Sequence, residues 1–214
     1  MKKIIFLLAF LLLFTGCTVK SINNEDIDSI IDSAIEEKNN DYLETFNGYE
    51  LKIPQGMKIV GKSDYNLKLL YDGDNYYLYI DIISKYHKKK VNYKENSSSY
   101  LSKKIEYNGN SGYIEINKTD DDRYIIKAEY NYAKIETIVS EGNLKIAAYN
   151  IVKVLSSIDY NDLIIETMIG ENALSYEEEE FNFFDSTREE GYFMDYVEEY
   201  SEYESNVKDE DVIK

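Results

Sequence analysis

The sequence predicts an α+β protein built on one antiparallel sheet of about five to seven strands covered by helices, with an acidic C-terminal appendage. Three observations predict this class. Apolar residues recur at helical spacing near Ile27 and again near Ile151, side chains alternate with period two between Tyr49 and Val139, and Asp-Gly and Asn-Gly pairs separate the alternating runs. The expected order of helix, strands and helix is that of an α-β-α sandwich-like domain.

The N-terminus has the layout of a secretory signal. Lys2 and Lys3 precede an apolar run from Ile4 to Phe14, and Thr15 and Gly16 supply small residues before Cys17. The run is shorter than the roughly 20 residues that cross a bilayer as a helix. We therefore expect residues 1–16 to be a signal peptide, with plain secretion and an uncleaved anchor as the alternatives.

Phe14-Thr15-Gly16-Cys17 resembles the lipobox of bacterial lipoproteins, with Phe14 where that pattern usually has Leu. The resemblance implies cleavage before Cys17 and lipid attachment to the Cys17 thiol. Two acyl chains hold a protein on a membrane stably, whereas one does not. It thus implies a protein anchored by lipid to the extracytoplasmic face of a bacterial cell membrane.

Residues 17–45 are expected to form a lipidated tether followed by an amphipathic helix. Asn24 can cap this helix, with Glu25 and Asp26 in its first turn. An apolar stripe follows at helical spacing: Ile27, Ile30, Ile31, Ala34 and Ile35. Such a stripe packs on the protein's own core or docks a partner, and Asn39-Asn40 ends the helix.

Residues 46–160 are expected to form the α+β domain. Strands are predicted at Tyr49–Ile53, Met57–Val60, Leu67–Tyr71, Tyr76–Ile83, Lys104–Tyr107 and Tyr113–Asn117, followed by a long strand-like stretch from Tyr124 to Val139. Hairpin turns are predicted at Asp72–Asn75, Asn108–Gly112 and Asp120–Asp122, because Asp, Asn and Gly tolerate positive φ. After Gly142-Asn143, a helix runs to Ile158.

This order resembles the PsbP-like family. The resemblance rests on the opening run Phe46-Asn47-Gly48-Tyr49-Glu50-Leu51-Lys52-Ile53-Pro54 and on the closing helix that ends in Val154-Leu155-Ser156-Ser157-Ile158. Met57 stands where many members have Trp. The match covers about Phe46 to Tyr160, and it implies a non-catalytic binding or assembly module that is extrinsic or tethered to a membrane.

The C-terminal segment, residues 161–214, carries most of the negative charge. It has 18 acidic and 3 basic residues, a net −15, while the whole chain is at −17. Phe193, Tyr196 and Tyr200 lie at helical spacing among the acids, and disordered segments are usually poor in aromatics. Whether this segment docks on its own domain or on a partner stays open at the level of the sequence.

A basic segment from Lys85 to Lys104 is the counterpart of the acidic one. It contains seven lysines and one acid, Glu95, a net +6. Lys88, Lys89 and Lys90 form its densest part and are candidate interaction residues. Three uses compete: a solvated face, contact with anionic lipid headgroups, and binding of an acidic partner, which could be the chain's own C-terminal segment.

Composition excludes several chemistries. The chain has a single histidine, His87, and a single cysteine, so sites built from several His and Cys ligands lack residues. No nucleotide-binding glycine motif occurs, and the acidic charge disfavours nucleic acid. Asp72–Asn75 and Asp120–Asp122 could offer oxygen to calcium but lack the 12-residue loop. We expect no catalytic residue, metal or cofactor.

The function expected from the sequence is therefore an extracytoplasmic, lipid-anchored binding or assembly module whose partners are the membrane and another extracytoplasmic protein. Two alternatives stay open. One is an enzyme that uses paired carboxylates, which the abundance of acids neither supports nor removes. The other is a carbohydrate- or calcium-binding surface protein, suggested by 22 tyrosines and the acidic turns.

Overall fold

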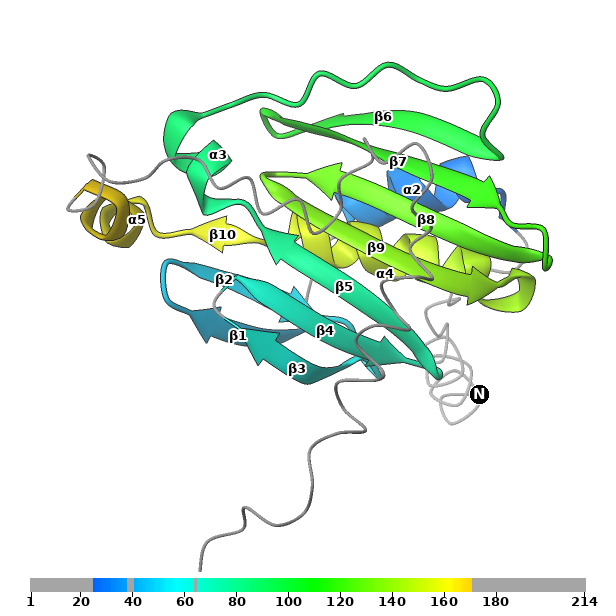
Figure 1. The fold of residues 1–214 in the computed structure, drawn as a ribbon, viewed down its shortest axis with the longest axis horizontal. Coiled ribbons are helices and arrows are strands. Elements are labelled where there is room, and N and C mark those ends of the chain that lie inside the picture. Colours follow the sequence, from blue (N-terminus) through cyan, green and yellow to red (C-terminus); the bar gives the residue numbers. More distant parts are fainter. Residues whose placement is uncertain (1–24, 38–40, 64, 171–214) are drawn as a thin grey trace, which may run out of the picture. The chain divides into compact units, whose positions relative to one another are not determined.

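The computed structural model describes residues 25–37, 41–63 and 65–170. The elements follow one another as α2 (Ile27–Glu36), β1 (Tyr42–Phe46), β2 (Tyr49–Ile53), β3 (Lys58–Ser63), β4 (Asn66–Tyr71), β5 (Asp74–Ile80), α3 (Ile82–His87), β6 (Leu101–Tyr107), β7 (Asn110–Lys118), β8 (Arg123–Tyr130), β9 (Ala133–Ser140), η3 (Glu141–Asn143), α4 (Leu144–Ser156), β10 (Asp159–Tyr160) and α5 (Asp162–Gly170) (Figure 1).

The strands form two sheets. A seven-stranded sheet has the order β3-β4-β5-β9-β8-β7-β6, and a three-stranded sheet has the order β1-β2-β10. Every pairing in both sheets is antiparallel. Together with the helices, these sheets confirm the predicted α+β class, and the larger sheet has the upper number of the five to seven strands expected. The separate three-stranded sheet was not predicted.

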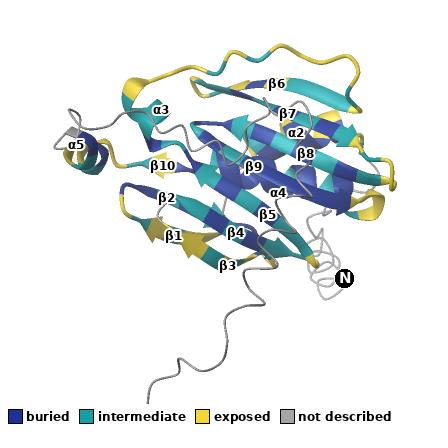
Figure 2. Cartoon of the chain, viewed as in Figure 1, coloured by how far each residue is buried: buried dark blue, intermediate teal, exposed yellow. Residues whose placement is uncertain are grey.

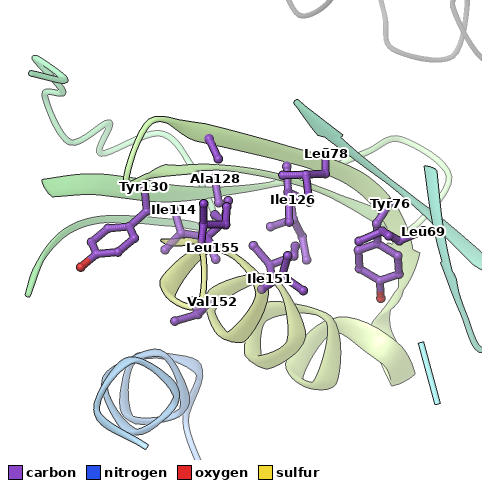
Figure 3. Packing of buried hydrophobic residues seen from close by; sticks show 14 of the residues in the cluster. Leu69, Tyr76, Leu78, Ile114, Ile126, Ala128, Tyr130, Ile151, Val152 and Leu155 are labelled. Carbon is purple, nitrogen blue, oxygen red and sulfur yellow. The ribbon is translucent and has the colours of Figure 1, made fainter. Parts of the chain in front are cut away.

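The core lies between the seven-stranded sheet and α4. Alternate residues of the central strands point to this helix, among them Tyr76, Leu78, Ile114 and Ile126, while Ile151 and Leu155 of α4 point back (Figure 3). Helices α2 and α4 lie on the same side of the sheet, behind it in this view (Figure 1). One face of the strands is therefore mostly apolar and buried, and its buried residues appear as dark bands along the strands (Figure 2).

Helix α2 packs on α4 through the predicted stripe. Ile27, Ile30, Ile31 and Ala34 are buried, and Ile35 is partly buried against the core. Lysines hold both ends of the helix: Lys145 Nζ donates to the Glu25 carbonyl at 2.6 Å, and Lys153 Nζ, almost fully buried, donates to the Glu37 carbonyl at 3.2 Å. The structure thus places this helix on the protein's own core.

The cap of α2 differs from the expected one. Asn24 lies outside the described residues, and Asp26, expected in the first turn, is the N-cap residue. Its carboxylate accepts the Ser29 N–H at 2.9 Å and thereby satisfies a donor that the helix itself leaves unpaired.

The hairpin turns lie where Asp, Asn and Gly predicted them. Asp72 and Gly73 have φ of 48° and 83°, and Asn108 and Gly109 have 48° and 82°. The strand-like stretch from Tyr124 to Val139 divides into β8 and β9 at Asn131 and Tyr132, which also have positive φ. A tyrosine rarely adopts this conformation, and no Gly or Pro marks this turn in the sequence.

Three short elements, β1, α3 and β10, are absent from the prediction. The predicted strand Tyr76–Ile83 ends at Ile80, because Asp81 caps α3 by accepting the Ser84 N–H at 2.7 Å. Residues 163–169 belong to α5, whose Ile165 and Ile169 are buried in the core. None of the helices in the described ranges is long and apolar enough to cross a membrane.

Candidate interaction surface

The second face of the seven-stranded sheet carries no helix within the described residues (Figure 1). Its side chains are those that alternate with the core residues, and cross-strand pairing arranges them in two neighbouring rows. The first row comprises Ser102, Glu115, Lys127, Glu136, Tyr77 and Lys68. The second row comprises Lys104, Tyr113, Glu129, Lys134, Tyr79 and Asn66. We call these twelve residues the charged face.

Opposite charges alternate within each row. Lys127 Nζ lies 3.7 Å from the Glu136 carboxylate, and Lys134 Nζ lies 3.9 Å from that of Glu129. Directly opposed residues of unlike charge stabilise a sheet, whereas like charges would destabilise it. These pairs therefore support the register of β8 and β9, and each row also contains a tyrosine of β5, Tyr77 or Tyr79.

Burial changes the acidity of this face. It raises the pKa of Glu136 to about 7, although Lys127 acts in the opposite direction. Burial also raises the pKa of Glu129. Desolvation disfavours the charged form of a carboxyl group, and Glu136 is only 7% exposed. At neutral pH the face thus contains a carboxyl group that titrates.

Glu115 behaves differently because it is an anchor for hydrogen bonds. Burial alone would raise its pKa, but hydrogen bonds from Tyr93, Asn117 and Ser99 outweigh burial and lower the pKa. The distances are 2.6 Å from Tyr93 Oη, 2.9 Å from Asn117 Nδ2 and 3.0 Å from Ser99 Oγ. A carboxylate that accepts several such bonds is stabilised in its charged form.

Two of those donors come from residues 88–100, which we call the strap. The strap connects α3 to β6 and runs along β6 (Figure 1). The Tyr93 ring stacks on that of Tyr113 with centroids 4.0 Å apart and an interplanar angle of 4°. The strap also pairs with the backbone of the edge strand, since the Glu95 carboxylate accepts the Lys104 N–H at 3.1 Å. It is thus fastened both to the charged face and to the edge of the sheet.

The candidate residues Lys88, Lys89 and Lys90 lie at the start of the strap, and all three are exposed. Lys88 has φ of 53° and ends α3, with its N–H directed to the Lys85 and Ser84 carbonyls. Their side chains point away from the buried part of the domain, as an interaction surface requires.

Other lysines of the basic segment have partners within the domain. Lys85 Nζ lies 2.9 Å from the Asp162 carboxylate and over the rings of Tyr132 and Tyr160. Lys103 pairs with Asp28 and Asp32 of α2, and Lys104 pairs with Glu106. Lys85 thus joins α3 to α5 and Lys103 joins β6 to α2, whereas the Lys104–Glu106 pair lies within β6.

Cys17, Phe193, Tyr196 and Tyr200 lie outside the described residues, so the structure does not place them. His87 is the last residue of α3 and contacts the Tyr86 ring edge-on. Within the described ranges, no three His, Cys, Asp or Glu side chains converge as metal ligands would.

The hydrogen bond between Tyr93 and Glu115 was not predicted from the sequence. The signal that could have found the strap was the spacing of Tyr86, Tyr93 and Tyr100 inside the basic segment, which indicated order but not what Tyr93 contacts. No protein-family model matches the chain, and no curated protein matches its sequence.

Proposed function

We propose that this protein is a lipid-anchored, extracytoplasmic binding or assembly module without catalytic activity. The observation that carries the proposal is that the two faces of the seven-stranded sheet differ in chemistry. One face holds the apolar core beneath α4, and the other presents the charged face with the strap fastened across its edge. Functional surfaces are commonly carried by segments positioned on a rigid scaffold.

The chemistry of the charged face supports binding rather than catalysis. Glu129 and Glu136 are acids with raised pKa, but they lie on a sheet surface and each faces a lysine across the ladder. A paired-carboxylate mechanism requires two acids that converge on one substrate bond. Rows of alternating charge with tyrosines are instead typical of a surface that binds another protein. Complementary charge sets the specificity of such binding, and tyrosine supplies contact area.

The membrane location follows from the N-terminal pattern. Nine residues separate Cys17 from Ile27, the first residue of α2. A chain of that length reaches at most about 30 Å when extended. A lipid on Cys17 would therefore keep the domain close to the membrane surface and restrict its partners to those within that reach.

The experiment is crosslinking in intact membranes followed by pull-down of the full-length protein, with and without residues 171–214, a truncation that keeps α5 and its core residues. We expect a specific extracytoplasmic partner whose recovery falls in a variant that carries Lys68→Glu and Tyr79→Ala on the charged face. Glu166→Gln, at an exposed position of α5, is the matched surface control. Failure to recover a partner, or a turnover activity that depends on Glu129 or Glu136, would refute the proposal.

A further inference from the structure

Strand β1 is a free edge of the three-stranded sheet. Within the described residues it pairs with β2 alone. The Lys52 N–H of β2 donates to Ser157 Oγ at 2.9 Å, away from β1, so its cross-strand partner Leu43 also directs its backbone groups outward. Alternation gives Thr45 the same orientation. Two N–H and two C=O groups are thus presented at this edge.

The other long edges are protected. Strand β3 carries a bulge between Ile59 and Gly61 and exposed lysines at Lys58 and Lys62, and both devices discourage strand addition. The edge of β6 is covered by the strap through the Glu95 contact with the Lys104 N–H. Strand β1, with the sequence Tyr-Leu-Glu-Thr-Phe, has no bulge, proline or lysine.

Apolar surface and a hollow adjoin this edge. Tyr42 is 71% exposed and Leu43 is 45% exposed. A hollow of about 410 Å³ lies at the start of β1, lined by Asp41, Tyr42 and residues Ile53–Met57. This volume falls in the range of sites that hold ligands or large side chains, about 300–1,000 Å³.

The geometry points to β1 as a strand-addition site for an extended segment of a partner protein, one that alternates apolar with basic residues. The inference deepens the proposed binding function and rests on it, but its site is separate from the charged face. In strand addition, backbone hydrogen bonds supply affinity and pockets for alternate side chains supply specificity. The outward backbone groups of Leu43 and Thr45 can supply these hydrogen bonds, and the hollow beside Tyr42 can supply a side-chain pocket.

The charge of β1 indicates which kind of segment would bind to this edge. Glu44 is the one charged side chain of β1, and it has no ion-pair partner within the described part of the chain. A Lys or Arg opposite Glu44 would form a favourable cross-strand pair. The chain's own segment 161–214, at net −15, carries the wrong charge. A second copy, in the symmetric register that pairs Leu43 with Thr45, would set the two Glu44 side chains against each other.

The test selects binders from a random dodecapeptide phage library on the purified full-length protein and measures synthetic versions of the enriched peptides. We expect enriched sequences to alternate apolar residues with Lys or Arg. Thr45→Pro removes an outward N–H without touching the β1–β2 ladder, and Leu43→Lys adds an edge-protecting charge. Each should weaken binding about tenfold or more, since tenfold corresponds to 1.4 kcal/mol and a hydrogen bond contributes about that much.

Leu163→Lys, at an exposed leucine of α5, is the matched control and should leave the affinity unchanged. Hydrogen exchange on the wild-type complex should protect the Leu43 and Thr45 amides even if one variant misfolds. No enrichment, acidic peptides, or equal binding to Thr45→Pro would overturn the inference. Peptides that bind through Lys68 and Tyr79 would overturn it while leaving the proposed function standing, and a dimer dissociated by Leu43→Lys would assign the edge to a second copy.

Discussion

Glu115 and Glu136 flank the same lysine, Lys127, on the charged face, yet their pKa values move in opposite directions. The difference comes from what surrounds each carboxyl group. Glu115 accepts three side-chain hydrogen bonds that favour its charged form, whereas Glu136 has burial and one lysine at 3.7 Å. The residue type alone therefore predicts neither behaviour.

Glu136→Gln should stabilise the protein at alkaline pH. The folded-state pKa of about 7 lies above the ordinary value of 4.5, so the folded state binds an extra proton between these values. The stability that Glu136 contributes is therefore fully present below about pH 4.5 and is lost as the pH rises through 7. Glutamine does not ionise, and we expect it to raise the free energy of unfolding at pH 8 by about 2–3 kcal/mol.

Urea unfolding at pH 8 and at pH 4.5 measures this effect, which should disappear at the lower pH. Glu115→Gln is the internal control and should have the opposite sign. The lowered pKa of Glu115 means that its contribution to stability is present at neutral pH and is lost in acid. Glutamine at this position would also remove the charged hydrogen bonds with Tyr93, Ser99 and Asn117. A Glu136→Gln variant less stable than the wild type at pH 8 would contradict the explanation.

At the scale of elements, most long strands and both long helices were predictable because each carries a regular apolar period. Two of the hairpin turns, at Asp72-Gly73 and Asn108-Gly109, were predictable because Asp or Asn is followed by Gly. Strand β1 escaped because only five residues pair and most are exposed, so alternation of burial is absent. The turn at Asn131 and Tyr132 escaped because tertiary contacts impose it. The Tyr160 hydroxyl donates to the carbonyls of both residues, and the Asp81 N–H donates to that of Tyr132.

Gly112→Ala should disrupt the pairing of β7 with β8. A Cβ at this position would lie well inside contact distance of the Glu129 carbonyl oxygen and 2.7 Å from Tyr130 Cα, and neither backbone atom can move aside without breaking the ladder. We expect a loss of about 3 kcal/mol or more in the free energy of unfolding.

Gly61→Ala provides the comparison, because its Cβ would meet only the Lys68 Cβ at 3.4 Å. We expect that change to cost less than about 1 kcal/mol. Chemical denaturation of the two variants side by side tests the difference, and similar midpoints would show that the β7–β8 backbone can separate to admit a side chain.

At the scale of the whole molecule, the proposed lipid anchor would determine where the charged face and the β1 edge can act. Cys17→Ser should release the protein from the membrane or leave the precursor uncleaved, because no diacylglyceryl group can attach without the thiol. Fractionation and mass spectrometry of the N-terminus measure both outcomes. Unchanged processing and membrane association in this variant would refute lipid attachment at Cys17.

The C-terminal segment is the remaining whole-molecule question. We expect residues 177–204 to dock through aromatic side chains, with their acids near the basic segment. Lys85, Lys103 and Lys104 pair within the domain, and we therefore expect those acids to meet the exposed Lys88 and Lys90. Exposed ion pairs contribute only about 0–1 kcal/mol each, so aromatic burial must supply most of the docking energy.

Replacing Phe193, Tyr196 and Tyr200 by serine should therefore loosen the segment more than added salt does, and hydrogen exchange of residues 177–204 is the measurement. Lys88→Gln combined with Lys90→Gln is the companion variant, and it should have the smaller effect. Wild-type protein without exchange protection in residues 177–204 would end this hypothesis.

The sequence by itself determined the α+β class, the long helices, the strands and the hairpin turns, because these depend on local periodicity and on residues that tolerate positive φ. It also supplied the pattern from which we infer a lipid anchor, since a signal is read as a linear segment. Only the tertiary structure decided which strands meet. That arrangement placed Glu136 beside Lys127, Tyr93 on Tyr113 and Glu95 at the edge of β6, and it left β1 unprotected. These contacts join residues that are distant in the chain, or involve elements without local periodicity. They form only when the strands pair and the core is buried.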